Sequence, residues 1–443
     1  MKSKLTPSFR ARRAGPCGRS VVWLAIGASL GIAAAPVFAD ETPIEKTPAT
    51  PVPPGPPPPS PPPSRRELNL VPIAGGDSDV GIGVGEVGDW ARLQPGTGLY
   101  RWRLESGAFI SFKLREQNDL IVPFQDYYLL LSQRNWGAEK RWTLDIRASF
   151  TDETTLKFYG IGNASSLPPA SLDVRESEYG RIHPTLSVEG RHAVAHNLYL
   201  LLGSVYTHNW LTVPAGGTLA TTHDSGPADM RAMLGSFDAH GVELLEAGIE
   251  YDSRDNEIIT RRGGFHALQV RYSPHISSEL PYPYEQIDLT TRVYATPIPR
   301  WLTLSARAVG DVLLGSPPFY ELARFNQTPA IGGVNAVRGV PAQRYYGKVK
   351  LFGNFEARSE LWPFQLHGKS LILGAAAFVD AGRVWTELDH SHPDLDGTGL
   401  GIKYGIGGGL RLQEGQTFVV RADLAWSPDA RPIGAYFAAG EIF

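Results

Sequence analysis

The sequence predicts an all-β protein, namely a single closed antiparallel transmembrane β-barrel of about 16 strands with a long lumen-folded loop. Three observations predict it. From Asp79 onward, strand-length segments follow one another with Gly, Pro and Asp at the breaks, and no helical period is sustained. Most segments have one apolar and one charged face. Finally, the long loop around GGVNAVRGV (332–340) precedes two strands that carry carboxylates.

The alternation is clear in residues 418–426. Phe418, Leu424 and Trp426 lie on one face, and Arg421 and Asp423 lie on the other. Segments 301–312 and 287–295 alternate in the same way. Lipid outside and water inside a barrel require this pattern. A soluble all-β protein would instead have to bury its apolar faces against one another, which leaves the charged faces unexplained.

The segments predicted as strands are 80–92, 99–115, 121–133, 140–150, 154–162, 178–190, 196–210, 242–252, 264–275, 284–297, 300–314, 347–361, 370–382, 399–412, 417–427 and 433–443. An even number suits a closed bacterial barrel. Short turns are predicted around Asp152, Ala195, Asp255, Pro299, Pro363 and Glu414, and long loops at 163–177, 211–241, 315–346 and 383–398. Short turns belong at the periplasmic end and long loops outside.

Residues 1–39 are predicted to be a secretory signal peptide. Six cations precede an apolar run from Val21 to Ala35, and Val37-Phe38-Ala39 resembles a cleavage site. The formal net charge of −3 would then become about −9. An exported, mildly acidic protein without a basic stripe is not expected to bind nucleic acid. The single cysteine, Cys17, lies before the apolar run, so neither a lipid anchor nor a disulfide is expected.

Residues 40–69 are predicted to be a periplasmic Pro-rich disordered spacer, followed by the barrel at 70–443. The tract PVPPGPPPPSPPP (51–63) would reach on the order of 40 Å as a stiff polyproline segment. A plain tether is the simple interpretation. A spacer or ligand for a periplasmic partner is the alternative.

Several motifs of the chain resemble the bacterial surface antigen family, which comprises the BamA- and TamA-type assembly barrels and the two-partner-secretion transporters. The resemblance covers residues from about 70 to the end. Its motifs, in order, are FYGIGN (158–163), YDSRDNEIITRRGGF (251–265), VRGV (337–340), NFEAR (354–358), FVDAG (378–382) and GIGGGLRL (405–412). It implies an integral protein of the bacterial outer membrane.

The resemblance also implies site residues. In this family the loop after the eleventh strand folds into the lumen, and its arginine meets acidic groups on the next two strands. Here these residues are Arg338, Glu356 and Asp380, with Gly339 allowing the bend. The aromatic residue usually found after that glycine is Val340 in this chain.

Two further features are predicted. Asp252, Arg254 and Asp255 would cross a periplasmic turn, either as a charge-locked turn that fixes strand register or with a direct functional role. Phe443, at the end of the last predicted strand, is similar to the C-terminal signal by which outer-membrane barrels are recognised for assembly. Glu441 stands where that signal usually has an apolar or aromatic residue.

The family's assembly and secretion members carry periplasmic polypeptide-transport-associated (POTRA) domains of roughly 75 residues by family resemblance. We expect none here, because only residues 40–79, rich in proline, lie between the predicted signal peptide and the barrel. Glycines in the predicted first and last strands (Gly81, Gly83, Gly85, Gly88, Gly434 and Gly440) suggest either a seam that opens or ordinary barrel curvature.

Two functions remain open from the sequence. One is insertion or translocation at the outer membrane, with loop 315–346 plugging the lumen; the other is a passive porin or specific channel. We expect no enzyme, since there is no H-E-x-x-H motif and His196, His266 and His275 are isolated. No cofactor and no metal are predicted. The outer loop with Asp389, His390, His392, Asp394 and Asp396 could bind a divalent metal, but an acidic solvated loop is the favoured interpretation. Expected partners are outer-membrane lipid and, during biogenesis, the barrel assembly machinery; client and solute are unknown.

Overall fold

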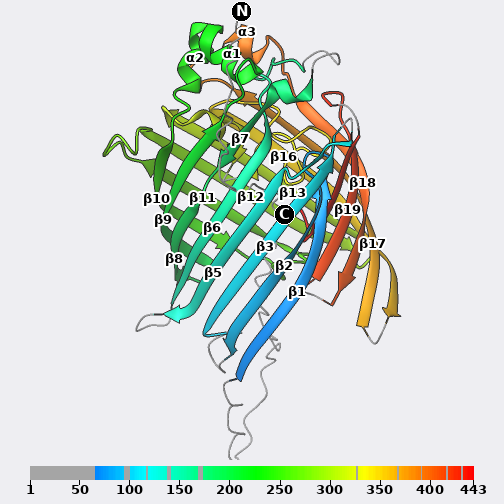
Figure 1. Cartoon of the computed structure of the whole chain (residues 1–443). Coiled ribbons are helices and arrows are strands. Elements are labelled where there is room, and N and C mark those ends of the chain that lie inside the picture. The colour runs from blue at the N-terminus through cyan, green and yellow to red at the C-terminus, as the bar shows by residue number, and fades with distance from the viewer. Residues whose placement is uncertain are drawn as a thin grey trace, which may run out of the picture.

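The fold is a closed antiparallel barrel of sixteen strands, seen in a computed structural model (Figure 1). The described residues are 65–93, 100–115, 118–136, 141–167, 173–325, 328–366, 369–390, 392–415, 418–430 and 433–443. The predicted signal peptide and residues 40–64 of the predicted spacer lie outside them.

The barrel strands are β1 (Arg65–Asp77), β2 (Gly81–Leu93), β3 (Trp102–Leu114), β5 (Phe124–Trp136), β6 (Trp142–Lys157), β8 (Thr185–Ala195), β9 (Leu198–Thr212), β10 (His240–Asp252), β11 (Gly263–Ser273), β12 (Tyr284–Ile298), β13 (Leu302–Gly315), β16 (Val349–Leu366), β17 (Lys369–Trp385), β18 (Lys403–Glu414), β19 (Phe418–Trp426) and β20 (Gly434–Ala439). Each pairs with its neighbours in chain order, and β7 (Glu178–Ile182) extends β8. β4 (Leu120–Ile121) pairs with the end of β3.

Side chains alternate across the barrel wall as the sequence predicted. In β19, Leu424 is 61% exposed on the outside, whereas Arg421 and Asp423 are almost fully buried on the lumen side. Asp288 and Leu289 of β12 differ in the same way. Apolar groups outside and charged groups inside confirm the predicted fold class.

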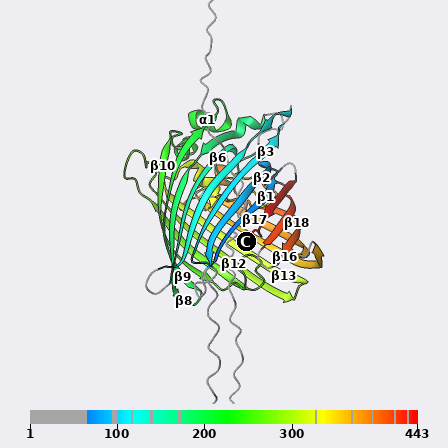
Figure 2. The ribbon, with the colours of Figure 1, turned by 60° about the horizontal axis from the view of Figure 1, so that its bottom comes forward.

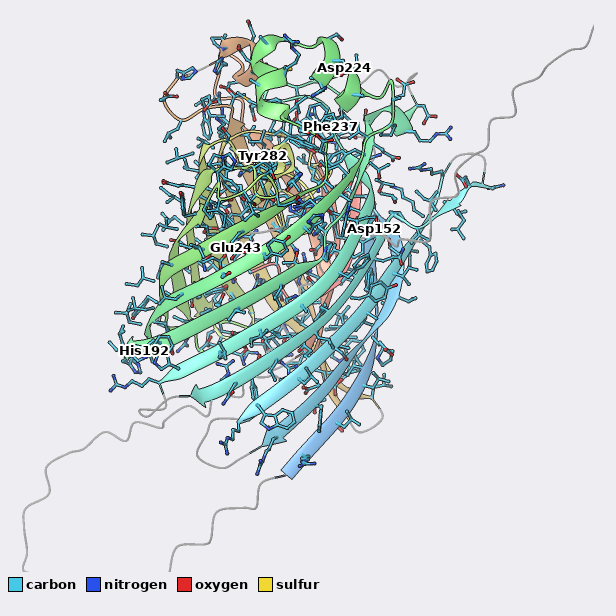
Figure 3. The ribbon with its side chains drawn as sticks, turned by 60° about the vertical axis from the view of Figure 1, so that its left-hand side comes forward. Asp152, His192, Asp224, Phe237, Glu243 and Tyr282 are labelled. Atoms are coloured by element: carbon cyan, nitrogen blue, oxygen red, sulfur yellow. The ribbon has the colours of Figure 1, made fainter. Side chains whose placement is uncertain are left out.

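The long connections gather at one end of the barrel and the short turns at the other (Figures 1 and 2). Short helices lie at the long-loop end: α1 (Thr218–Ser225), α2 (Ala228–Leu234) and α3 (Pro393–Asp396), with the 3-10 turn η2 (Val174–Ser177) in the β6–β7 connection. Figure 3 shows Asp224 of α1 at this end and His192 of β8 at the opposite end. Within the described part of the chain, no helix is long and apolar enough to cross a membrane.

The predicted number of sixteen strands is right, but only because two errors cancel: one strand was predicted as two, and the first strand was not predicted. The segments predicted at 140–150 and 154–162 are one strand, β6, so the turn predicted at Asp152 is wrong. Asp152 is buried within the strand, and an irregular register between Glu153 and Leu156 absorbs the local break in pattern. Likewise, Pro363 lies inside β16 rather than in a turn.

The second error concerns the first strand. β1 begins at Arg65, inside the segment predicted as spacer, so the barrel begins before the predicted residue 70. Pro72 lies within it, a position that an edge strand tolerates because one side of its backbone is not paired. The glycines predicted for the first strand, Gly81 to Gly88, therefore lie in β2.

The last strand is shorter than predicted. β20 ends at Ala439, and residues 440–443 leave the sheet. Phe443 is 8% exposed, and its ring centroid lies 5.2 Å from the guanidinium carbons of both Arg307 and Arg358, two lumen-facing residues. The expectation that Phe443 ends the last strand is wrong, because this tail turns into the lumen.

Candidate functional site: the lumen loop and the seam

The connection from β13 to β16, residues 316–348, folds into the barrel and is called the lumen loop here. It contains the 3-10 turn η3 (Phe319–Ala323) and the short strands β14 (Arg324–Phe325) and β15 (Thr328–Pro329). Apolar residues of the loop pack against the wall formed by β13, β16 and β17. Ile331, Ala336, Val337, Val340 and Tyr345, all fully buried, pack with Phe352 and Val384 of the wall.

Arg338 lies at the centre of a buried charge cluster. Its side chain and those of Glu356 and Asp380 have no exposed surface, and the ion-pair distances are 2.6 Å to Glu356 and 2.7 Å to Asp380. The structure thus brings these three predicted residues together. A third carboxylate, Asp423 of β19, lies 3.0 Å from the Arg338 guanidinium.

Neighbouring arginines balance the remaining negative charge. Arg411 contacts Asp423 at 2.5 Å and Glu441 at 3.0 Å, and Arg421 contacts Asp423 at 3.0 Å. Arg358 contacts Glu356 at 2.7 Å. Four guanidinium groups and four carboxylates therefore form one network, called the Arg338 cluster here. Buried charges persist only where each is compensated in this way.

The sequence reasoning missed Asp423 as a partner of Arg338. Parity had placed Asp423 on the polar face of its strand, so a signal existed. The sequence does not reveal the register of β17, β18 and β19. This register pairs Asp380 with Gly405 and Asp423 with Gly409. Small residues on β18 leave room for the loop arginine to reach across to β19.

Two glycines allow the close approach of the loop to the wall. Gly339 has φ +91°, a conformation that side chains rarely adopt. At Gly405 of β18, an added Cβ would meet the carbonyl oxygen of Arg338 far inside contact distance. Val340, which replaces the family's usual aromatic residue, is fully buried in the apolar part of the loop.

The loop tip also contacts both sides of the seam where the barrel closes. The Gly339 backbone amide donates to the Tyr436 hydroxyl of β20 at 2.8 Å. The Ala342 amide donates to Asp79, in the β1–β2 turn, at 2.9 Å. Burial raises the pKa of the Asp79 carboxyl above its ordinary value, although the Ala342 hydrogen bond and the charges of Lys113 and Lys157 act in the other direction.

The predicted periplasmic turn lies between β10 and β11 and is locally braced. Arg254 and Asp252 form an ion pair at 2.7 Å. The Asp255 carboxylate accepts hydrogen bonds from the backbone amides of Arg261 and Arg262 at 2.9 and 3.1 Å. These contacts are what a register-fixing turn needs. A direct functional role of the turn stays a prediction.

The acidic outer loop at 389–396 does not gather a metal-ligand set. Asp396 accepts from the Thr386 backbone and hydroxyl at 2.9 and 3.0 Å, and His390 contacts Asp389 at 2.6 Å. Among the residues that the structure describes, no group of three or more His, Cys, Asp or Glu side chains could hold a metal ion.

A closed sixteen-stranded barrel with an apolar exterior, a charged interior and an inward-folded loop defines an integral β-barrel of the outer membrane. The chain belongs to the Omp85 superfamily, because the Omp85 superfamily domain matches residues 126–443. The predicted family and location are thereby confirmed.

Solved structures share the fold. BamA from Haemophilus ducreyi lacking POTRA domains 1–3 is 14% identical, with a TM-score of 0.55, covering 85% of this chain and 70% of that chain. CdiB from Escherichia coli is 13% identical, with a TM-score of 0.50, covering 85% of this chain and 67% of that chain. No curated protein matches the sequence.

Proposed function

We propose that this barrel inserts or translocates polypeptides at the outer membrane by opening between β1 and β20, while the lumen loop closes the lumen at rest. The observation that carries the proposal is the weak pairing at this seam. β1 pairs with β2 along all 13 of its residues, whereas its register with β20 comprises only Gly76 with Phe437 and Asp77 with Tyr436 among the described residues.

The short pairing leaves most of the β1 edge available to another strand. Residues 65–75 of β1 have register partners in β2 but none in β20 among the described residues. An unpaired strand edge is a template for strand addition, in which main-chain hydrogen bonds supply the affinity. An incoming β-strand is therefore the kind of client that this edge fits.

Closure of the lumen rests on the Arg338 cluster. Removing the loop would leave the carboxylates of Glu356, Asp380 and Asp423 without the guanidinium that they surround. Because Gly339 and Ala342 also hold the two sides of the seam, displacement of the loop tip and opening of the seam are coupled.

A disulfide across the seam tests the proposal. The Ser78 amide donates to the Ala435 carbonyl at 3.0 Å, and both side chains are exposed, so Ser78→Cys with Ala435→Cys can bridge the turn after β1 to β20. Cys17→Ser removes the one native cysteine. Ala74→Cys with Val84→Cys, register partners in β1 and β2, is the matched control.

The assay is the folding of an unfolded model outer-membrane barrel into liposomes that contain each protein. We expect the reduced seam variant to accelerate folding of the model barrel, and the control to accelerate it in both redox states. The oxidised seam variant should not accelerate it. Equal acceleration by the oxidised seam variant would contradict seam opening. No acceleration by any form, together with steady ion conductance, would favour the alternative function, a passive porin or channel.

A further inference from the structure

The lumen loop has a second buried ion pair, on the wall opposite the Arg338 cluster. Arg324, 2% exposed, lies in β14 near the beginning of the loop, and its guanidinium contacts the carboxylate of Glu153 in β6. The His183 Nε2 atom lies 3.1 Å from the same carboxylate. Figure 3 shows Asp152, the residue next to Glu153, on the wall towards the helix-covered end.

The two ion pairs lie across the barrel from each other. Following the strand pairings, β6 and β17 are eight strands apart in either direction around the ring of sixteen. Glu153 belongs to β6 and Asp380 to β17. The loop therefore spans the lumen, with Arg324 held at one wall and Arg338 at the other.

The two arms of the loop are held by carboxylates on different strands. Arg338 has three carboxylates within 3.0 Å. Arg324 contacts the carboxylate of Glu153 in β6. Nearby, the Arg181 guanidinium carbon lies 3.7 Å from the Tyr320 ring centroid, and Arg181 lies 3.8 Å from Glu321. Substitution of Glu153 therefore removes a carboxylate from the Arg324 arm and leaves the three carboxylates around Arg338 in place.

A polar cavity of about 310 Å³ lies directly against this part of the loop. Its wall comes from the strands β6 to β12, and the loop contributes Tyr320, Glu321 and Arg324. The lining includes Ser187, Arg271 and the buried Tyr284 hydroxyl, which has no hydrogen-bond partner among the described residues. A polar cavity of this size holds water.

We propose that Arg324 and Glu153 form a second latch, which closes this cavity towards the long-loop end independently of the Arg338 cluster. When the latch is released, the first arm of the loop moves away and small hydrophilic solutes pass from outside into the cavity. The Arg338 arm stays in place, because its carboxylates lie on other strands. The inference rests on the closing role of the loop in the proposed function, but not on seam opening.

Cysteine accessibility in whole cells tests the second latch. In a Cys17→Ser background, Ser187→Cys reports on the cavity, and Ser305→Cys, at a lumen-facing position of β13, reports on the other side. The probe is a membrane-impermeant maleimide added outside. Glu153→Gln is the test variant, and Asp173→Asn, which removes an exposed carboxylate from an ion pair with Arg175, is its control.

We expect Glu153→Gln to accelerate labelling of Ser187→Cys by about tenfold or more and to leave Ser305→Cys unchanged, because losing a charge-assisted hydrogen bond shifts a closed population by that order. Arg338→Ala should accelerate labelling of Ser305→Cys and leave Ser187→Cys unchanged. Asp173→Asn should change neither labelling rate. Unchanged Ser187→Cys labelling in Glu153→Gln, or opening of both reporters by Arg338→Ala alone, would overturn the second latch.

Folding is checked separately by the heat-dependent mobility of each variant in detergent gels. If Glu153→Gln does not fold, Arg324→Gln removes the other partner and should give the same labelling pattern. A negative seam-disulfide result alongside a positive cavity result would reject the proposed function and keep the latch. A positive seam-disulfide result alongside a negative cavity result would keep the proposed function and reject the latch.

Discussion

The Gly339 backbone amide donates a hydrogen bond to the Tyr436 hydroxyl at 2.8 Å, so the tip of the lumen loop is tied directly to the closing strand. Tyr436 is also one of the two residues through which β20 pairs with β1. Asp79, just after β1, accepts from Ala342 of the same loop tip. The loop tip therefore bridges β20 and the turn that follows β1, on the two sides of the seam.

Arg338→Ala should convert a mostly closed protein into a conducting one. The substitution leaves three buried carboxylates without their shared cation, and breaking a buried ion pair by removing one partner costs about 3–5 kcal/mol. Conductance of the refolded protein in planar bilayers measures this. Arg175→Ala, at an exposed ion pair, is the control. Equal, steady conductance of wild type and Arg338→Ala would mean that the lumen is an open pore.

Tyr436→Phe should loosen the seam without removing the ring. The buried Gly339 amide loses its acceptor, which costs about 1–3 kcal/mol. We expect faster hydrogen exchange of the Gly76 and Asp77 amides, at the paired end of β1. Tyr127→Phe, whose hydroxyl contacts Gln125 at an exposed site, is the matched control. Identical exchange in Tyr436→Phe and wild type would show that the loop tip does not hold the seam.

Asp79→Asn should alter the pH dependence of stability. Because the folded-state pKa of Asp79 is raised by burial, its favourable contribution is present below the unfolded value of about 3.9 and is lost as pH rises through the raised pKa. The amide keeps an acceptor for Ala342 and carries no charge. The thermal stability of Asp79→Asn should thus match wild type in acid and exceed it increasingly with rising pH. Asp224→Asn, which removes an exposed carboxylate, is the control.

Phe443→Ala should separate two roles of the C-terminal residue. Its ring packs against Tyr294 and between Arg307 and Arg358, so truncation should lower the stability of the refolded barrel by about 3–5 kcal/mol. A fall in stability in vitro with a normal amount in the outer membrane would indicate packing alone. A reduced amount in cells, with unchanged stability in vitro, would support the predicted assembly signal instead.

Much of the barrel was predictable because alternation is a local property. Residues two apart in a strand share a face whatever the strand pairs with, so Arg421 and Asp423 could be assigned to the lumen before any register was known. The positions at which strands begin and end were harder to predict from the sequence. β6 passes through Asp152 because its polar side chains find partners inside, and β1 accepts Pro72 because one of its edges is largely unpaired.

The site divides in the same way. The contacts of Arg338 with Glu356 and Asp380 were implied by family resemblance, and parity placed those carboxylates on the lumen face. The contact of Arg324 with Glu153, 171 positions apart, has no local signal. It exists only because the loop crosses the closed ring.

The sequence by itself thus determined a barrel with a polar interior, since a period of two is set by the pleat of each strand. Ring closure decided the rest: which charges meet across the lumen, how short the seam is, and where the tail from Gly440 to Phe443 lies. These depend on strand register and on the distance between opposite walls, and both are set by the whole barrel together.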